Sequence, residues 1–342
     1  MKYPRPSDYI EPYLDDAVRG HRREAVRLAI DLLDQGVREE LVVTELLAAA
    51  QREVGERWYR NELTVADEHV ATGVSSAALE ALSNEARLPD GVGHTVVACA
   101  EGDWHALAAQ MFGESLRGYA IGVTVLGAST PAAAVAELIT RRGADSLAVS
   151  CSLPIFYPGV ASLVDRAHAH GIPVIVGGRA FGGDARRAER LGADAWAPGA
   201  AEAAGILAGW RAIPPSISRD PVHLDPVAVH LADRAGELGR AGEEGLLARF
   251  PQMATYDERQ LARTREDLVF IVQFLAAATL VADDSVFTDF LDWLQTLLVA
   301  RGVRPQGLIA GLEALAPLIG AIDGRRTRHL DSGRERPVHR DG

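Results

Sequence analysis

A carboxylate and an imidazole stand two residues apart in the segment Asp103-Trp104-His105, directly after a short apolar run. The run, Thr95 to Ala100, is typical of a buried strand, and a helical pattern begins near His105. At such a strand end, a histidine can bind a metal through one ring nitrogen while Asp103 accepts a hydrogen bond from the other. The alternative is that His105 only starts the helix, and an isolated Asp-x-His pattern does not decide between the two.

Small or hydroxyl-bearing residues end two further runs that are expected to be strands. They are Ser150 and Ser152 after the run from Ser146, and Gly177 and Gly178 after the run Pro173 to Val176. The carboxyl ends of parallel strands meet at one edge of a sheet, where doubly wound folds bind ligands. We therefore expect these positions to lie near Asp103 and His105 and to leave a slot at that edge.

Trp58, Glu68 and His69 form a second candidate group. The first 89 residues have helical apolar periodicity, and Thr64 with Asp67 three residues later predicts a capping box at the start of a helix. An antiparallel helix hairpin would bring the indole, the carboxylate and the imidazole to one end of the bundle. The alternative reading of Trp58 is a core residue.

The elements that position these groups fall into three parts. Residues 1–89 predict a four-helix bundle, and residues 90–212 alternate five short apolar runs with helices. Residues 213–219 are a Pro- and Ser-rich linker, residues 220–325 are helical, and residues 326–342 predict a flexible tail. The expected fold class is α/β plus all-α: an N-terminal four-helix bundle, a flavodoxin-like doubly wound parallel sheet of five strands, and a C-terminal helical domain.

Composition narrows the function. The net charge of −12 opposes direct nucleic-acid binding, which depends on Lys and Arg replacing counterions. The most apolar stretch, Leu268 to Ala282, is too short and too interrupted to span a bilayer, so no membrane partner is expected. The only cysteines, Cys99 and Cys151, lie in apolar runs, which favours a reducing, cytoplasmic location over a disulfide framework.

The Asp-x-His, Ser-Cys-Ser and Gly-Gly elements, in this order, resemble the cobalamin-binding domain of the methionine synthase type. In that family the pattern D-x-H-x-x-G, S-x-L and G-G houses the nucleotide tail of the corrinoid, and the histidine is the lower cobalt ligand. The resemblance implies cobalt binding by His105, with the cofactor contacted by Asp103, Trp104, Ser150, Ser152, Gly177 and Gly178. Two positions depart from the pattern: Ala108 replaces its first glycine, and Ser152 replaces its leucine.

The spacing of Trp58, nine residues and then Glu68-His69 resembles the W-x9-E-H signature of the cap in CarH-type light sensors. There these side chains cover the adenosyl group, so the resemblance implies adenosylcobalamin between Trp58, Glu68 and His69 above and His105 below. No basic winged-helix region precedes the bundle. Tyr59 also stands where those repressors have a histidine that takes the upper cobalt face after photolysis, which leaves His69 or water for that role.

The order of bundle, cobalamin domain and globin-like helical domain resembles the photocobilins, light sensors that carry adenosylcobalamin and a bilin. This resemblance implies a biliverdin site in the third part, with Arg259 and Arg263 among the cations that would pair with its propionates. No cysteine follows Cys151, so this biliverdin would be bound noncovalently. Simple core packing is the alternative explanation of the aromatic residues in the helices of this third part.

The resemblances imply a photoreceptor that signals when light breaks the cobalt–carbon bond and the cap and corrinoid domains reorient. The alternative from another class is a corrinoid carrier that shuttles methyl groups between methyltransferases, and a ligand-free scaffold is disfavoured. No P-loop or catalytic nucleophile is evident, so a sensor is expected rather than an enzyme. Its expected partners are further copies of the chain and a separate effector protein in trans.

Overall fold

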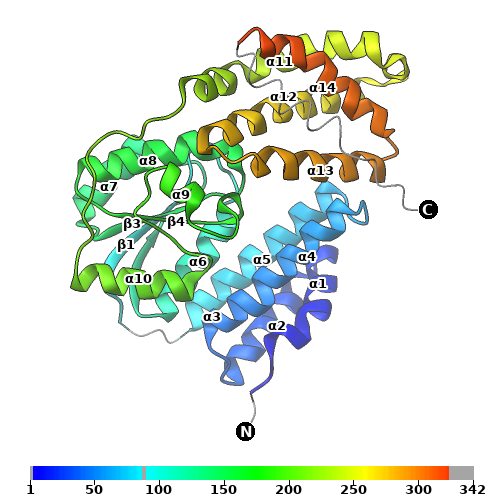
Figure 1. Cartoon of the computed structure of the whole chain (residues 1–342). Helices are drawn as coiled ribbons and strands as arrows, with labels where there is room; N and C mark the ends of the chain where they lie inside the picture. The colour runs from blue at the N-terminus through cyan, green and yellow to red at the C-terminus, as the bar shows by residue number, and fades with distance from the viewer. Residues whose placement is uncertain (1–2, 87–89, 323–342) are drawn as a thin grey trace. The chain divides into compact units, whose positions relative to one another are not determined.

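The computed structural model describes residues 3–86 and 90–322 of the 342-residue chain. The chain divides into two compact units, Met1–Val222 and His223–Gly342. The first contains a helical bundle followed by an α/β sheet, and the second is helical (Figure 1). The predicted tail, 326–342, and residues 87–89 of the predicted first domain lie outside the described residues.

Four helical stretches form the N-terminal bundle, as the apolar periodicity predicts. In chain order they are α1 (Ile10–Arg19), α2 (Arg22–Asp34), a third stretch made of α3 (Glu39–Leu41), η2 (Val42–Leu47) and α4 (Ala48–Tyr59), and α5 (Val65–Glu85). A short 3-10 turn, η1 (Pro6–Tyr9), precedes them, and η2 is a π-helical segment. The predicted capping box is confirmed: Thr64 accepts from the backbone N–H of Asp67 (3.2 Å), and Asp67 accepts from that of Thr64 (2.8 Å).

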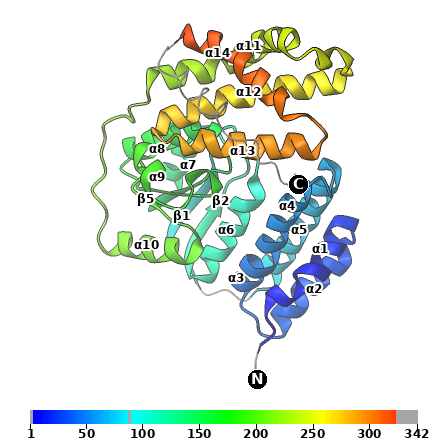
Figure 2. The same ribbon diagram turned by 45° about the vertical axis from the view of Figure 1, so that its right-hand side comes forward.

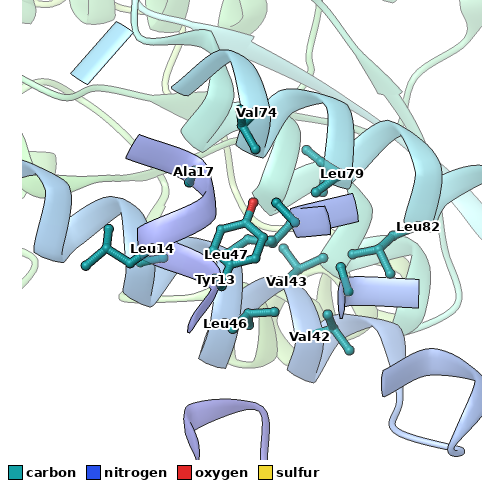
Figure 3. Close-up of a cluster of buried hydrophobic side chains, with 14 of the residues drawn as sticks. Tyr13, Leu14, Ala17, Val42, Val43, Leu46, Leu47, Val74, Leu79 and Leu82 are labelled. Carbon is teal, nitrogen blue, oxygen red and sulfur yellow. The ribbon is translucent and has the colours of Figure 1, made fainter. Parts of the chain in front are cut away.

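The bundle buries a continuous apolar core around Tyr13, which Figure 3 shows between Leu47, Val43 and Val74. Burying one such large side chain contributes about 1.5–3 kcal/mol. Met111 and Leu107 of the next helix also pack against this core, and Ser83 of α5 donates a hydrogen bond to Glu114 (2.9 Å). The bundle and the α/β sheet, predicted as separate domains, therefore share a core and form one unit.

The five predicted strands are confirmed within three residues at each end. They are β1 (Val92–Cys99), β2 (Ile121–Val125), β3 (Ser146–Ser150), β4 (Val174–Gly177) and β5 (Ala195–Trp196). All pairs are parallel and the order is β2-β1-β3-β4-β5, which is the flavodoxin-like order. Cys99 lies opposite Ser150 and Ser150 opposite Gly177, so β1, β3 and β4 end at the same level.

Helices cover both faces of the sheet (Figure 1). They are α6 (Ala106–Gly118), α7 (Ala132–Arg142), α8 (Tyr157–Ala169), the short α9 (Arg186–Arg190) and α10 (Ala200–Ala212), with single 3-10 turns η3 (Pro154–Phe156) and η4 (Arg179–Phe181). Helices α6 and α10 share one face, where Leu116 and Ala203 pack against Val97, Ala148 and Ile175. Both faces are thereby buried, as a parallel sheet requires.

The second unit contains four long helices (Figure 2). They are α11 (Pro226–Arg249), α12 (Glu258–Val281), α13 (Ser285–Ala300) and α14 (Pro305–Gly320), with a 3-10 turn η5 (Pro251–Thr255) between the first two. Helices α11 and α12 pack closely where Gly239 faces Val269: a Cβ at Gly239 would fall 2.5 Å from a methyl of Val269. The globin-like identity of this unit remains a prediction.

The boundary between the units differs slightly from the predicted linker, 213–219. Val222 stays with the first unit because its backbone N–H donates to Asp165 (2.7 Å) and its side chain lies over Gly192. Helix α11 then starts at Pro226, with Asp225 as its N-cap, inside the part predicted to be helical, 220–325. Among the described residues, no helix is both long and apolar enough to cross a membrane.

Candidate functional site

The carboxyl ends of β1 and β3 form the point of the sheet where a ligand crevice is expected. Helix α6 leads from β1 outward to β2, whereas α8 leads from β3 in the other direction to β4. Such a topological switch point opens a crevice between the two connections in doubly wound sheets. The segments that follow these strands contain Asp103, His105 and Ser152.

Asp103 is buried and anchors His105 at this point. Its Oδ1 lies 2.6 Å from His105 Nδ1 and accepts the backbone N–H of His105 (3.0 Å), while its side chain is only 1% exposed. The imidazole itself is 58% exposed. The fixed Nδ1 therefore leaves Nε2 of His105 available to a ligand.

Charge and hydrogen bonding set the protonation of this pair. Burial acts to raise the pKa of Asp103, but the hydrogen bonds from the His105 ring and from the backbone N–H groups of His105 and Ser152 lower it overall. The hydrogen bond to Asp103 raises the pKa of His105 and outweighs the opposing effect of burial. An ionised Asp103 thus makes the imidazole more basic and a stronger metal ligand.

Asp103 also connects this element to the end of β3. Its Oδ2 accepts the backbone N–H of Ser152 (2.7 Å), so one carboxylate links two of the elements that the sequence placed at strand ends. Ser129, in the segment after β2, was not expected at the site. Its hydroxyl accepts the N–H of Gly102 (3.0 Å), its N–H donates to the Asp103 carbonyl (2.9 Å), and its φ of 46° is left-handed. A strained serine in a loop carries no pattern that sequence reasoning could have used.

Gly177, the last residue of β4, and Gly178 lie against neighbouring backbone. A Cβ at Gly178, which has φ of 105°, would fall 2.4 Å from the carbonyl oxygen of Cys151. A Cβ at Gly177 would fall 2.9 Å from the carbonyl oxygen of Ala197. The space that side chains would fill is occupied by neighbouring backbone, so these glycines allow the strand-end loops to approach one another.

The bundle residues lie where the hairpin hypothesis predicts. Trp58 is the next-to-last residue of α4, and Glu68 and His69 are in the first turns of α5, with Glu68 Oε2 and His69 Nε2 3.4 Å apart. The charge of Glu68 makes a small contribution to raising the pKa of His105, after the hydrogen bond and charge of Asp103. Thr72, four residues after Glu68, donates to its carboxylate (2.9 Å) and was missed, although this helical spacing brings side chains together.

Comparison with known proteins decides what this edge of the sheet binds. A family model described as a B12 binding domain matches residues 93–205, and a second model with the same description matches residues 9–83. These residues bind cobalamin. The two matched segments of this B12-binding region correspond to the α/β sheet and to the helical bundle in front of it.

Two individual proteins are similar to this B12-binding region. The HTH-type transcriptional repressor CarH of Myxococcus xanthus is 32% identical over 151 residues, which are 43% of this chain and 50% of the repressor. The match thus spans only half of the repressor. The monomethylamine corrinoid protein of Methanosarcina barkeri has a structure that superposes with a TM-score of 0.51, covering 58% of this chain and 96% of that one at 22% identity. That likeness supports the fold of the first unit.

The residues present fit a corrinoid. Among residues 3–86 and 90–322, no three His, Cys, Asp or Glu side chains are grouped to hold a metal ion by themselves. A single anchored imidazole suits a metal whose other ligands come from an organic ring. Trp104, 77% exposed beside His105, offers a flat apolar surface to such a ring.

The second unit contains a small cavity whose wall does not include Arg259 and Arg263, the two cations expected at a biliverdin site. The cavity measures about 60 Å³, enough for a few water molecules. Its wall is apolar apart from Tyr256, Thr264 and Asp267, and burial raises the pKa of Asp267 to about 6. Arg259 is exposed and Arg263 pairs with Glu266 (3.4 Å), and neither lines the cavity. Both stand near the exposed start of α12, and the charge of Arg263 acts on Asp267 in the cavity wall.

Replacing Asp103→Asn is expected to affect both stability and cobalamin binding. The amide keeps one acceptor oxygen for His105 but places an NH2 group against the N–H of Ser152 or the ring, leaving a buried donor unpaired. That costs about 1–3 kcal/mol in the free energy of unfolding, and the misoriented imidazole weakens cobalamin binding about 10- to 100-fold. Urea unfolding and absorbance titration with hydroxocobalamin measure the two effects.

Asp145→Asn is the matched control for this change. Asp145 Oδ2 also accepts a backbone N–H, that of His94 (2.7 Å), but it lies before β3, at the opposite end of the strands. The control should lose stability and keep its affinity for cobalamin. Equal affinities in both variants would contradict a role of Asp103 in orienting His105.

Proposed function

We propose that this protein is a light-responsive receptor that binds adenosylcobalamin between the helical bundle and the carboxyl edge of the sheet. The observation that carries the proposal is the pair of polar groups from two elements, Glu68 of the bundle and the Asp103-anchored His105 of the sheet, close enough for their charges to interact. The similarity to the repressor CarH, confined to half of that protein, supports the same reading.

In this proposal, different residues contact the lower and the upper face of cobalamin. His105 holds the cobalt from below, with Asp103 fixing its ring and Trp104 beside the corrin. Trp58, Glu68 and His69 face the upper ligand, and the ion pairs of Arg57 with Glu53 (3.0 Å) and Glu11 (2.9 Å) brace the end of α4 that carries Trp58. When bound, adenosylcobalamin supplies a cobalt–carbon bond that light can break. Loss of the adenosyl group removes what the bundle end packs against, and the bundle can then shift on the sheet.

The output is expected to pass through protein contacts rather than through a reaction. We propose that the change at the bundle alters the assembly of several copies of the chain or the binding of a separate effector protein. Light scattering of the adenosylcobalamin-loaded protein, before and after green illumination, tests this directly. An identical spectrum and mass in the dark and after light would contradict the receptor role. Stable loading with methylcobalamin and transfer of its methyl group to a thiol acceptor would instead support the alternative, a corrinoid methyl carrier.

Trp58→Ala is expected to weaken adenosylcobalamin at least tenfold more than hydroxocobalamin. The indole offers a large apolar surface to the adenosyl group, worth roughly 1.5–3 kcal/mol when buried, and has much less to contact on a small hydroxyl ligand. Absorbance titrations with both cobalamins in the dark measure the ratio. Trp210→Ala, another half-buried tryptophan in α10, is the control and should leave the ratio unchanged. Equal losses for both cobalamins in the Trp58 variant would show that this residue only packs the bundle.

For the second unit we propose noncovalent biliverdin as an additional chromophore. The support for this proposal is the apolar cavity with Asp267, whose carboxyl group can accept pyrrole N–H groups. Arg259 and Arg263 do not line the cavity and therefore do not support it. Binding would require the helices around the cavity to separate. A red absorption band that stays with the protein in gel filtration is the expected result. No retained biliverdin, under conditions where cobalamin binds, would make the unit a dimerisation or partner-binding domain.

A further inference from the structure

A chain of hydrogen bonds runs from the buried core of the bundle to the carboxylate of Glu68. Tyr13 Oη donates to Ser75 Oγ (3.1 Å), and Gln51 Nε2 donates to the same oxygen (2.8 Å). Thr72 Oγ1 lies 3.1 Å from Gln51 Oε1 and 2.9 Å from Glu68 Oε1. Tyr13 and Ser75 are fully buried, so the chain begins at a rigid point.

Gln51 has one defined amide orientation in this chain. Its NH2 group donates both to Ser75 Oγ and to the carbonyl oxygen of Ala71 (3.3 Å). A flipped amide would place Oε1 against that carbonyl, which offers no hydrogen. The Oε1 atom therefore faces Thr72 and fixes the position of the threonine hydroxyl.

The hydroxyl of Thr72 has one hydrogen and two acceptors within reach. Glu68 Oε1 is nearer than Gln51 Oε1, and a hydrogen bond to an ionised carboxylate is stronger than one to an amide. The hydrogen is thus shared, with the stronger bond to Glu68 Oε1 and the weaker one to Gln51 Oε1. The other contact of this carboxylate, with His69, joins side chains that are 36% and 74% exposed, and such exposed pairs contribute little.

We infer that Thr72 and Gln51 are positioning residues that hold the Glu68 carboxylate ready for the upper ligand of cobalamin. This inference rests on the proposed function. A free glutamate side chain loses rotamer entropy on being ordered. Ordering it in advance, from the core of the bundle, removes that cost from ligand binding.

The test compares the dissociation constants of adenosylcobalamin and hydroxocobalamin, measured by absorbance titration of the full chain in the dark. Thr72→Val keeps the shape and removes the hydroxyl, and we expect it to lower the preference for adenosylcobalamin about five- to tenfold. Thr72→Ser keeps the hydroxyl and should restore the preference. Gln51→Leu removes only the weaker of the two acceptors of Thr72 and should lower the preference less than Thr72→Val does.

Thr44→Val is the matched control. Its hydroxyl bonds to the backbone carbonyl of Glu40 (2.6 Å) in the same bundle and is not connected to Glu68. The control should leave the preference unchanged, and because it makes the same substitution, it separates a general loss of helix stability from a loss of positioning.

Three results would distinguish a failure of the proposed function from a failure of the positioning role of Thr72 and Gln51. If the wild type does not prefer adenosylcobalamin, the proposed function fails, and the inference fails with it. If Glu68→Gln abolishes the preference while Thr72→Val leaves it intact, the proposed function stands and the inference is wrong. If Thr72→Ser does not restore what Thr72→Val loses, the effect is one of packing, and the inference is again wrong.

Discussion

Replacing Glu39→Gln is expected to reduce the pH dependence of stability between about pH 4.5 and pH 7. Glu39 is 3% exposed, and neither of its carboxyl oxygens has a hydrogen-bond partner among the described residues. Burial, followed by the charges of Glu114 and Glu40, raises the pKa of Glu39 from 4.5 to about 7, against the opposing charge of Arg117. The neutral acid is therefore the form that the folded bundle accommodates.

The direction of the pH effect follows from proton binding. Between pH 4.5 and 7 the folded protein holds a proton on Glu39 that the unfolded chain releases, so stability falls as the pH rises through this window. A shift of this size corresponds to about 3 kcal/mol at pH 8, since each pKa unit is worth about 1.4 kcal/mol. Below pH 4.5 both states are protonated and the penalty vanishes.

Urea unfolding of wild type and variant at pH 5, 6, 7 and 8 measures this difference, and hydrogen exchange of peptides from α3 and η2 locates it. Glutamine cannot ionise, so the free energy of unfolding of the variant should change less with pH than that of the wild type. Glu45→Gln, which removes an exposed carboxylate from the same helical stretch, is the control and should keep the wild-type slope. Parallel pH profiles for wild type and the Glu39 variant would show that Glu39 does not bind the proton.

This buried acid lies where the bundle meets the sheet. Glu114 and Arg117 belong to α6, the helix that follows His105, and Ser83 of α5 also bonds to Glu114 (2.9 Å). Gly118 of the same helix lies against Glu40, since a Cβ there would fall 3.1 Å from its carboxylate. A shift of the bundle on the sheet would change the surroundings of these charges, so light-driven movement should be accompanied by proton uptake or release in an unbuffered solution.

His105→Ala is expected to abolish the imidazole-bound spectrum of the cobalamin and to weaken its binding by at least ~100-fold, because the loss of a ligand exceeds the 10- to 100-fold cost of losing an outer-shell partner. The side chain is more than half exposed, and Asp103 keeps its hydrogen bonds from the backbone N–H groups of His105 and Ser152. The buried Asp103 nevertheless loses the ring donor on its Oδ1, so the free energy of unfolding of the cobalamin-free protein should fall by about 1–3 kcal/mol.

His21→Ala is the matched control, since His21 is also exposed and its Nδ1 lies 3.2 Å from an aspartate oxygen, that of Asp16. This substitution removes an equivalent histidine–aspartate contact, which lies in the helical bundle and not at the strand ends. It should leave the cobalamin spectrum and affinity unchanged. A spectrum of the His105 variant that still reports an imidazole ligand would mean that another histidine binds the cobalt.

The sequence by itself determined the elements and the lower half of the site. Short apolar runs and period-3.6 patterns, together with the Thr64 capping box, indicate where strands and helices begin, because local backbone preferences and burial act over a few residues. Asp103 and His105 are two residues apart at a strand end, so their hydrogen bond also follows from local geometry. The same holds for Glu68 and Thr72, one helical turn apart.

Only the tertiary structure decided which distant groups meet. The contact of Asp103 with Ser152 joins residues 49 apart, and that of Gln51 with Ser75 joins residues 24 apart. The unpaired burial of Glu39 against Glu114 and the absence of Arg259 and Arg263 from the cavity wall depend on how helices pack. Packing sums many weak contacts between elements, whereas a sequence pattern records only which face of each element is apolar, so charge and hydrogen-bond partners across elements stay undetermined until the chain folds.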